Sequence, residues 1–182
     1  MESYYYKPHN SLRKAAQGRR LSAIILLWIM VIGYYCVICA FSGRPAAEST
    51  KESNVIVEKV VKVVKTVRKT EGENHKIFSE VEFAVRKMAH FLNFYIFGFL
   101  CIMLSAVLCG NRIAARGAAA ALICGLLGAA IDEWHQFYVP GRSAEVRDVC
   151  VDFAGVSIGC LTFVAALHFA PRKGNAKSGK AM

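Results

Sequence analysis

The residues from Leu21 to Phe41 include no charged side chain. An α-helix rises about 1.5 Å per residue, so a stretch of this length crosses the ~30 Å hydrocarbon core of a bilayer. Three more apolar stretches follow, at residues 88–108, 117–131 and 149–170. An open strand cannot satisfy its backbone hydrogen bonds in lipid, so each stretch is expected to be helical. The sequence therefore predicts an all-α integral membrane protein with four transmembrane helices.

Composition agrees with a membrane protein of one domain. The chain has 182 residues, 55% of them hydrophobic, and a net charge of +10. Its mean hydropathy is +0.35, which is too apolar for an ordinary soluble domain. Most of the basic excess lies at the two termini beside apolar stretches, and it forms no basic face with exposed aromatic residues. We therefore expect no nucleic-acid partner. The predicted organisation is a basic tail (1–20), a four-span domain (21–170) and a second basic tail (171–182).

The distribution of Lys and Arg predicts the orientation, because cytoplasmic flanks of membrane spans are enriched in these residues. Residues 1–20 carry five basic residues opposed only by Glu2, and both Arg112 and Arg116 lie between the second and third spans. The tail 171–182 is basic and has no acid. Four spans place these three regions on one side, so both termini are expected to be cytoplasmic. The loops 42–87 and 132–148 would then face outward, with Trp134, Phe137 and Tyr138 in the outer aromatic belt.

An alternative is that the first stretch is a cleaved signal peptide, since it has a basic start and small residues near 40–47. Its apolar run is longer than the usual core of a signal peptide, which favours a span.

Residues 55–69 of the outer loop are rich in Val and Lys. Five valines fall on one face at helical spacing, whereas the Lys residues lie largely elsewhere: Val57, Val60, Val61, Val64 and Val67. This pattern predicts an amphipathic helix, which either rests on the outer membrane surface or packs on the spans. The content of Val also permits a strand.

Polar residues gather at the predicted outer ends of the spans. Ionisable groups at the edge of a span cost free energy unless they are paired or functional, so these residues form the candidate site. A Pro140-Gly141 turn brings the chain back over the group. Gly155 and Gly159 form a GxxxG pattern that lets two helices approach closely, so the acids one and two turns earlier are expected to face a helix. The candidate residues are Arg86, Lys87, His90, Asp132, Glu133, His135, Gln136, Arg142, Asp148 and Asp152.

Three interpretations of this group remain open. In the first, the basic and acidic side chains pair with one another and fix helix packing. In the second, Arg142 and Lys87 hold an anionic headgroup or phosphate. In the third, His135 or His90 is a general base oriented by an acid, and Arg142 stabilises an oxyanion.

The third interpretation lacks an obvious nucleophile, because Ser143 is not in a GxSxG turn. Two His and several carboxylates suit a metal ion, but no HExxH or similar spacing occurs. We therefore expect no metal and no cofactor from the sequence.

Three segments of the chain resemble the VanZ-like family of bacterial integral membrane proteins. They are Phe41-Ser42-Gly43-Arg44-Pro45, then Arg86-Lys87-Met88-Ala89-His90-Phe91 with Gly98, and then 132–142 with Asp148, Gly155 and Gly159. The resemblance covers residues 21–168. The chain departs from the family at Asn93-Phe94, where Glu-Tyr is common, and at Asp152, where Asn is common. The additional charge of Asp152 would have to be balanced by Arg142, Lys87 or Arg86.

The resemblance implies a multi-pass protein of the bacterial plasma membrane. The family takes its name from a protein linked to low-level resistance to teicoplanin, a lipid-tailed glycopeptide. The leading hypothesis is a non-enzymatic envelope protein that binds or organises a lipid-linked anionic molecule. Its candidate partners are membrane lipids, a lipid-linked cell-wall precursor or a glycopeptide. The alternatives are a membrane enzyme acting on a lipid or phospho-lipid, and a packing or assembly subunit. The sequence assigns no oligomeric state.

Overall fold

The computed structural model describes residues 9–68, 74–109 and 115–170, and every regular element within them is an α-helix. The helices are α1 (His9–Ser42), α2 (Ala46–Arg68), α3 (Asn74–Leu108), α4 (Ala115–Gln136) and α5 (Val146–Phe169). Four segments are long and apolar enough to cross a membrane: Arg13–Ser42, Lys76–Leu108, Ala115–Gln136 and Val146–Phe169. The prediction of an all-α, multi-pass membrane protein is confirmed, and α2 is the additional amphipathic helix.

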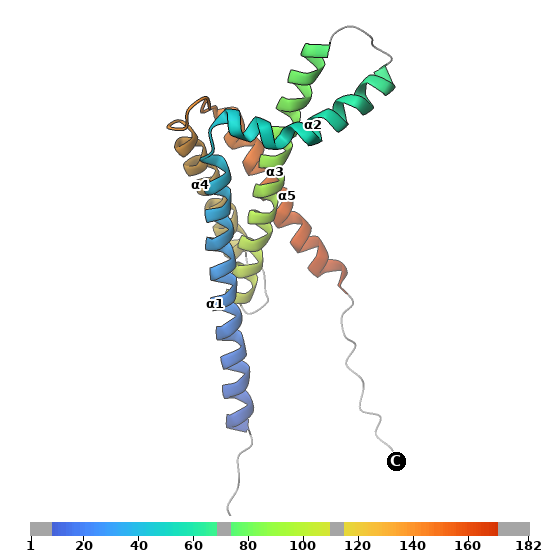
Figure 1. Ribbon diagram of the computed structural model, residues 1–182. Helices are drawn as coiled ribbons and strands as arrows, with labels where there is room; N and C mark the ends of the chain where they lie inside the picture. The colour runs from blue at the N-terminus through green and yellow to red at the C-terminus, as the bar shows by residue number, and fades with distance from the viewer. Residues whose placement is uncertain (1–8, 69–73, 110–114, 171–182) are drawn as a thin grey trace, which may run out of the picture.

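Helix α3 is the centre of the bundle, since it contacts each of the other four helices. Figure 1 shows α1, α3 and α4 side by side, α5 leaning away from α1, and α2 lying across one end. At this end α1 and α4 finish and α5 begins, and we call it the polar end. The first and last described residues, His9 and Ala170, lie toward the opposite end (Figure 1).

Helices α3 and α5 pack backbone against backbone. A Cβ atom added to Gly155 would overlap the carbonyl oxygen of Phe91, and one added to Gly159 would overlap the carbonyl oxygen of Tyr95. The GxxxG prediction is therefore confirmed, since only hydrogen fits at these two positions. Fully buried Phe94 and other apolar side chains complete the core around this contact. The close approach fixes the start of α5 against α3, where the polar candidates lie.

The helices extend beyond the apolar stretches from which they were predicted. Helix α1 begins at His9, so part of the predicted basic tail 1–20 is helical. Helix α3 begins at Asn74, so the predicted loop 42–87 is mostly α2 and the first turns of α3. The predicted tail 171–182 and Arg112 lie outside the described residues.

Helix α2 packs on the first turns of α3. Val57 and Val61 form a buried cluster with Ile77 and Val81. Because Ala46–Arg68 is an α-helix, the strand alternative for this segment is wrong. Other apolar side chains of α2 remain exposed, among them Val63 at 62%. The described part of this segment, which ends at Arg68, therefore packs on a span through one edge of its apolar face and leaves the rest uncovered.

Candidate ligand-binding site

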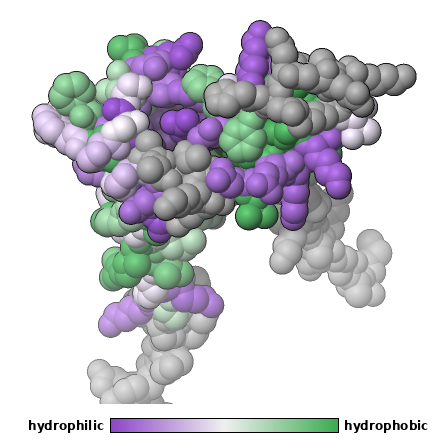
Figure 2. Space-filling model, turned by 45° about the horizontal axis from the view of Figure 1, so that its top comes forward, coloured by the Kyte–Doolittle hydropathy of each residue, from purple (hydrophilic) through white to green (hydrophobic). Residues whose placement is uncertain are grey.

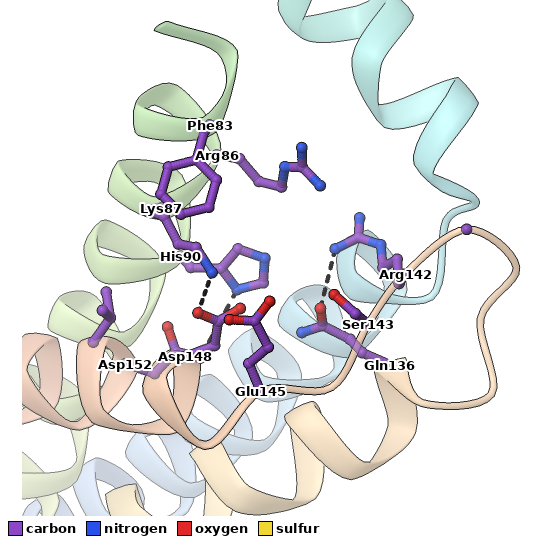
Figure 3. Close-up of a pocket in the computed structure, with 12 residues that line it drawn as sticks. Phe83, Arg86, Lys87, His90, Gln136, Arg142, Ser143, Glu145, Asp148 and Asp152 are labelled. Carbon is purple, nitrogen blue, oxygen red and sulfur yellow. Dashed lines mark hydrogen bonds and ion pairs between the residues drawn. The ribbon is translucent and has the colours of Figure 1, made fainter. Parts of the chain in front are cut away.

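A pocket of about 260 Å³ opens at the polar end of the bundle. Hydrophilic side chains gather over this end, and hydrophobic side chains cover the shaft of α1 beneath it (Figure 2). Helices α3, α4 and α5 and the connection between α4 and α5 all contribute to the wall. The residues that line it are Phe83, Arg86, Lys87, His90, Gln136, Gly141, Arg142, Ser143, Glu145, Asp148, Val151 and Asp152 (Figure 3).

The α3 side of the pocket is one helical face, because Phe83, Lys87 and His90 are three to four residues apart. The Lys87 ammonium forms an ion pair with the Asp148 carboxylate of α5. It also lies 5.0 Å from the centre of the Phe83 ring, within the range of a cation–π contact. Lys87 is thus already neutralised by Asp148, which leaves less of its charge for a ligand than the sequence suggested.

The opposite side of the pocket is formed by Arg142. As predicted, the Pro140-Gly141 turn directs the chain back over the end of α4, and Gly141 has a φ of 77°, a conformation that favours glycine. The Arg142 guanidinium donates hydrogen bonds to Gln136 Oε1 at 3.3 Å, to the Arg44 carbonyl at 3.1 Å and to the Phe41 carbonyl at 3.5 Å. All three acceptors are neutral.

Two cations, Arg86 and Arg142, face this pocket, and among the described residues neither forms an ion pair with a carboxylate that lines it. Figure 3 shows the guanidinium groups of Arg86 and Arg142 directed toward one another across the opening. Arg86 approaches Glu82 to 4.0 Å, and its side chain is 42% exposed. Burial lowers the pKa of Arg142 from its ordinary value, and the positive charge of Arg86 lowers it further. Their mutual repulsion would be relieved by an anion between them.

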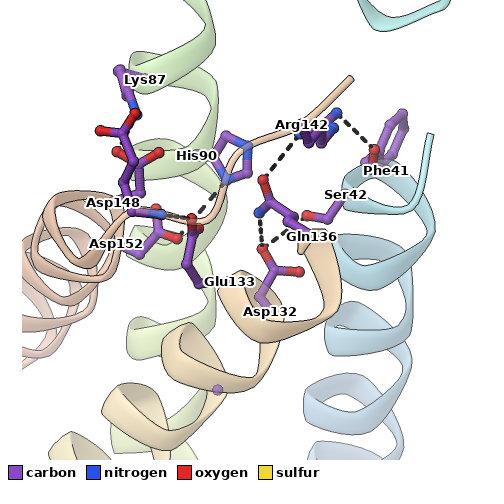
Figure 4. A network of polar contacts seen from close by, with 12 residues as sticks. Phe41, Ser42, Lys87, His90, Asp132, Glu133, Gln136, Arg142, Asp148 and Asp152 are labelled. Atoms are coloured by element: carbon purple, nitrogen blue, oxygen red, sulfur yellow. Dashed lines mark hydrogen bonds and ion pairs between the residues drawn. The ribbon is translucent and has the colours of Figure 1, made fainter. Parts of the chain in front are cut away.

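Three buried carboxylates lie at the base of the pocket: Asp152 of α5 lines it, and Asp132 and Glu133 of α4 lie beneath it. Asp132 Oδ2 accepts hydrogen bonds from Ser42 Oγ and from Gln136 Nε2, both at 2.9 Å (Figure 4). Together with the bonds of Arg142, this network joins the ends of α1 and α4 to the connection that follows α4. Polar contacts at this depth therefore fix the shape of the pocket floor.

The predicted candidate residues are only partly brought together. Arg86, Lys87, His90, Gln136, Arg142, Asp148 and Asp152 line the pocket. Asp132 and Glu133 are buried in its floor (Figure 4). His135 lies apart from it, exposed on the other side of α4, where a Cβ at Gly43 would stand 3.1 Å from its ring. His135 therefore does not line the pocket.

Pairing of opposite charges accounts for only part of the set. Among the described residues, Lys87 and Asp148 form the ion pair that joins a basic candidate to an acidic one. Asp152, which was expected to be balanced by Arg142, Lys87 or Arg86, forms no direct ion pair with them among the described residues, and its Oδ2 lies 3.9 Å from Nδ1 of His90.

Three of the groups that shape the site were absent from the predicted set. Ser42 holds Asp132, Glu145 donates its backbone N–H to Glu133 Oε1 at 2.6 Å, and Phe83 lies beneath Lys87. Ser42 belongs to the Phe-Ser-Gly-Arg-Pro segment that carries part of the family resemblance, and this was the one signal available for it.

The VanZ/LLP1 family model matches residues 25–167, which include all four apolar helices over most of their length and the whole pocket. No match was found among curated proteins or solved structures. Because the family model covers most of the chain, the protein belongs to the VanZ/LLP1 family.

Proposed function

We propose that this protein is a non-enzymatic component of the bacterial cell envelope that binds the anionic headgroup of a lipid or lipid-linked molecule in the pocket at the polar end. The observation that carries the proposal is the environment of Arg142. Its guanidinium faces the pocket together with Arg86, and its acceptors in the described chain are neutral. Guanidinium groups bind phosphate and carboxylate oxygens through paired hydrogen bonds, which are stronger when the acceptor is charged.

The position of the pocket supports a ligand with a lipid tail. The pocket opens at the end of four apolar helices, where a headgroup lies when its chains enter the hydrocarbon region. Trp134, Phe137 and Tyr138 are 66%, 67% and 66% exposed at the same end. Aromatic side chains of this kind are enriched at the level of the headgroups.

The distribution of basic residues supports an outward-facing pocket. Arg13, Lys14, Arg19 and Arg20 lie on the part of α1 far from the pocket, and Arg116 begins α4 at that same end. Basic flanks mark the cytoplasmic side of a span, so we propose that the end far from the pocket and both termini are cytoplasmic. A lipid-tailed glycopeptide or a cell-wall precursor at the outer leaflet would then reach the pocket. Binding there would displace the drug from its usual position, and susceptibility to the drug would fall.

Native mass spectrometry in mild detergent tests the binding. We expect wild-type protein to carry an anionic lipid that Arg142→Ala loses and that the matched variant Arg116→Ala, altered at the far end, retains. Folded Arg142→Ala that keeps the same lipid would contradict the proposal. A loss of folded protein in Arg142→Ala would favour the structural interpretation of the cluster.

A second experiment tests the consequence in cells. A deletion strain is complemented with wild type, Arg142→Ala or Arg116→Ala at equal abundance, and its susceptibility to a lipid-tailed glycopeptide is measured. We expect Arg116→Ala to match wild type and Arg142→Ala to match the deletion. Equal rescue by all three would exclude this role for the pocket.

A further inference from the structure

The floor of the pocket contains carboxylate oxygens that the rest of the described chain leaves without hydrogen-bond partners. They are both oxygens of Asp152, Oδ1 of Asp132 and Oε2 of Glu133. The side chains are almost completely buried, with exposed fractions of 1%, 0% and 5%. A buried carboxylate oxygen without a hydrogen-bond partner is unfavourable, and among the described residues no Lys or Arg forms an ion pair with these three acids, so the arrangement favours a bound cation.

Three side chains at the floor of the pocket bring their ligand atoms close to one point. One ligand atom each of His90, Asp132 and Asp152 lies within 4.8 Å of the other two. Bonds from Zn²⁺ to nitrogen and oxygen are about 2.0–2.2 Å long, so ligands of one ion stand about 3 to 4 Å apart. A small rotation of these side chains closes the difference. Figure 4 shows Glu133 near Asp152, but its carboxylate is not one of the three groups that meet this spacing.

Hydrogen bonds hold two of the carboxylates by one oxygen and leave the other oxygen available. Asp132 is held through Oδ2 by Ser42 and Gln136, and its Oδ1 has no partner. Glu133 is held through Oε1 by the backbone N–H of Glu145, and its Oε2 has no partner. Outer hydrogen bonds of this kind orient the ligands of protein metal sites.

We propose that His90, Asp132 and Asp152 bind a divalent transition-metal cation, Zn²⁺ or Mn²⁺. One imidazole nitrogen with carboxylate oxygens suits these ions better than Ca²⁺ or Mg²⁺, which take oxygen ligands. The ion neutralises the buried carboxylates at the floor. Because His90 and Asp152 also line the pocket, the ion is accessible from it. The site requires only these side chains and does not depend on the anionic ligand proposed above.

Sequence spacing did not indicate this site because its ligands come from three different helices. His90 is on α3, Asp132 on α4 and Asp152 on α5. A motif such as HExxH places two ligands on one helix, whereas here packing alone brings the groups together.

The metal content of the purified, tag-free protein tests the proposal. Elemental analysis after dialysis against Zn²⁺ or Mn²⁺ is expected to give about one ion per chain. We expect Asp152→Asn and His90→Gln to lose most of it. The matched variants Glu58→Gln on α2 and His168→Gln at the far end of α5 are expected to retain it. No retained ion in wild type, or equal content in all five proteins, would overturn the proposal.

X-ray absorption of the Zn²⁺-loaded wild type gives a test that does not depend on folding of the variants. We expect a first shell of nitrogen and oxygen with the outer-shell signal of one imidazole. A first shell that contains sulfur would assign the ion to some of the seven cysteines and overturn the proposal. Thermal unfolding of metal-stripped wild type with Zn²⁺, Mn²⁺, Mg²⁺ or Ca²⁺ added separately tests the selectivity. A midpoint rise with Zn²⁺ or Mn²⁺ is expected, and a rise with Mg²⁺ or Ca²⁺ alone would contradict it.

Discussion

Replacement of Gly155 by Ala tests whether the contact between α3 and α5 holds the site together. An added Cβ would overlap the carbonyl oxygen of Phe91 and stand 3.1 Å from the backbone nitrogen of Tyr95. Both obstacles are backbone atoms of α3, so no side-chain rotation removes the overlap. The two helices must separate at this level, one turn from Asp152 and its neighbour His90.

The expected loss of stability is the difference between two effects. Ala is favoured over Gly inside a helix by about 1 kcal/mol. Overfilling of a packed contact costs about 1–3 kcal/mol, and a clash with backbone belongs at the upper end of that range. The net loss for Gly155→Ala is therefore about 2 kcal/mol. For a chain of this length that corresponds to a fall in Tm of roughly 4–8 °C.

Thermal unfolding in detergent, followed by circular dichroism, measures this loss. Gly33→Ala is the matched control, because a Cβ at Gly33 in the span of α1 meets no atom within 4 Å. We expect Gly33→Ala to unfold at or slightly above the wild-type temperature. If Gly155→Ala were as stable as Gly33→Ala, the backbone contact between α3 and α5 would not be what positions Asp152.

Three more experiments test separate contacts. In a double-mutant cycle, Lys87→Met and Asp148→Asn are expected to show a coupling of about 1 kcal/mol, since the ion pair is only partly buried; additive losses would refute the pair. Ser42→Ala removes a hydrogen bond from the buried Asp132 and is expected to lower the free energy of unfolding by about 1–2 kcal/mol, whereas an unchanged midpoint would exclude that bond. Val57→Ala should cost about 2 kcal/mol at the contact of α2 with α3, and faster hydrogen exchange confined to α2 would reveal it; exchange at the wild-type rate would show that α2 is held otherwise.

The spans were predictable from sequence because a bilayer demands a minimum length of apolar helix. The true ends of the helices were not, since hydropathy detects only the part of a helix that lies in lipid. Residues 74–87 continue α3 as a polar helix because α2 covers one side of them through Val57 and Val61. That support comes from a segment distant in sequence, and local patterns do not contain it.

The candidate site was predictable in location more than in detail. The sequence placed both His135 and Gln136 in the candidate site with Asp132, but successive residues of a helix are about 100° apart. Gln136 therefore reaches Asp132 Oδ2, whereas His135 lies on the exposed side. The neighbouring helix α1 sets the orientation of Asp132, because Ser42 at its end donates the other hydrogen bond to this carboxylate.

The most direct test of a headgroup site is the affinity of the purified protein for two lipids that differ only in headgroup charge. A polyprenyl phosphate and the corresponding polyprenol serve, titrated into wild type, Arg142→Ala and Arg116→Ala. A charged hydrogen bond contributes about 1.5–3 kcal/mol, so Arg142→Ala should weaken binding of the phosphate by about 10- to 150-fold. Arg116→Ala should bind as wild type does, and the alcohol should bind weakly to all three. Equal affinity for the two lipids, or for the phosphate in wild type and Arg142→Ala, would contradict an anionic headgroup site at Arg142.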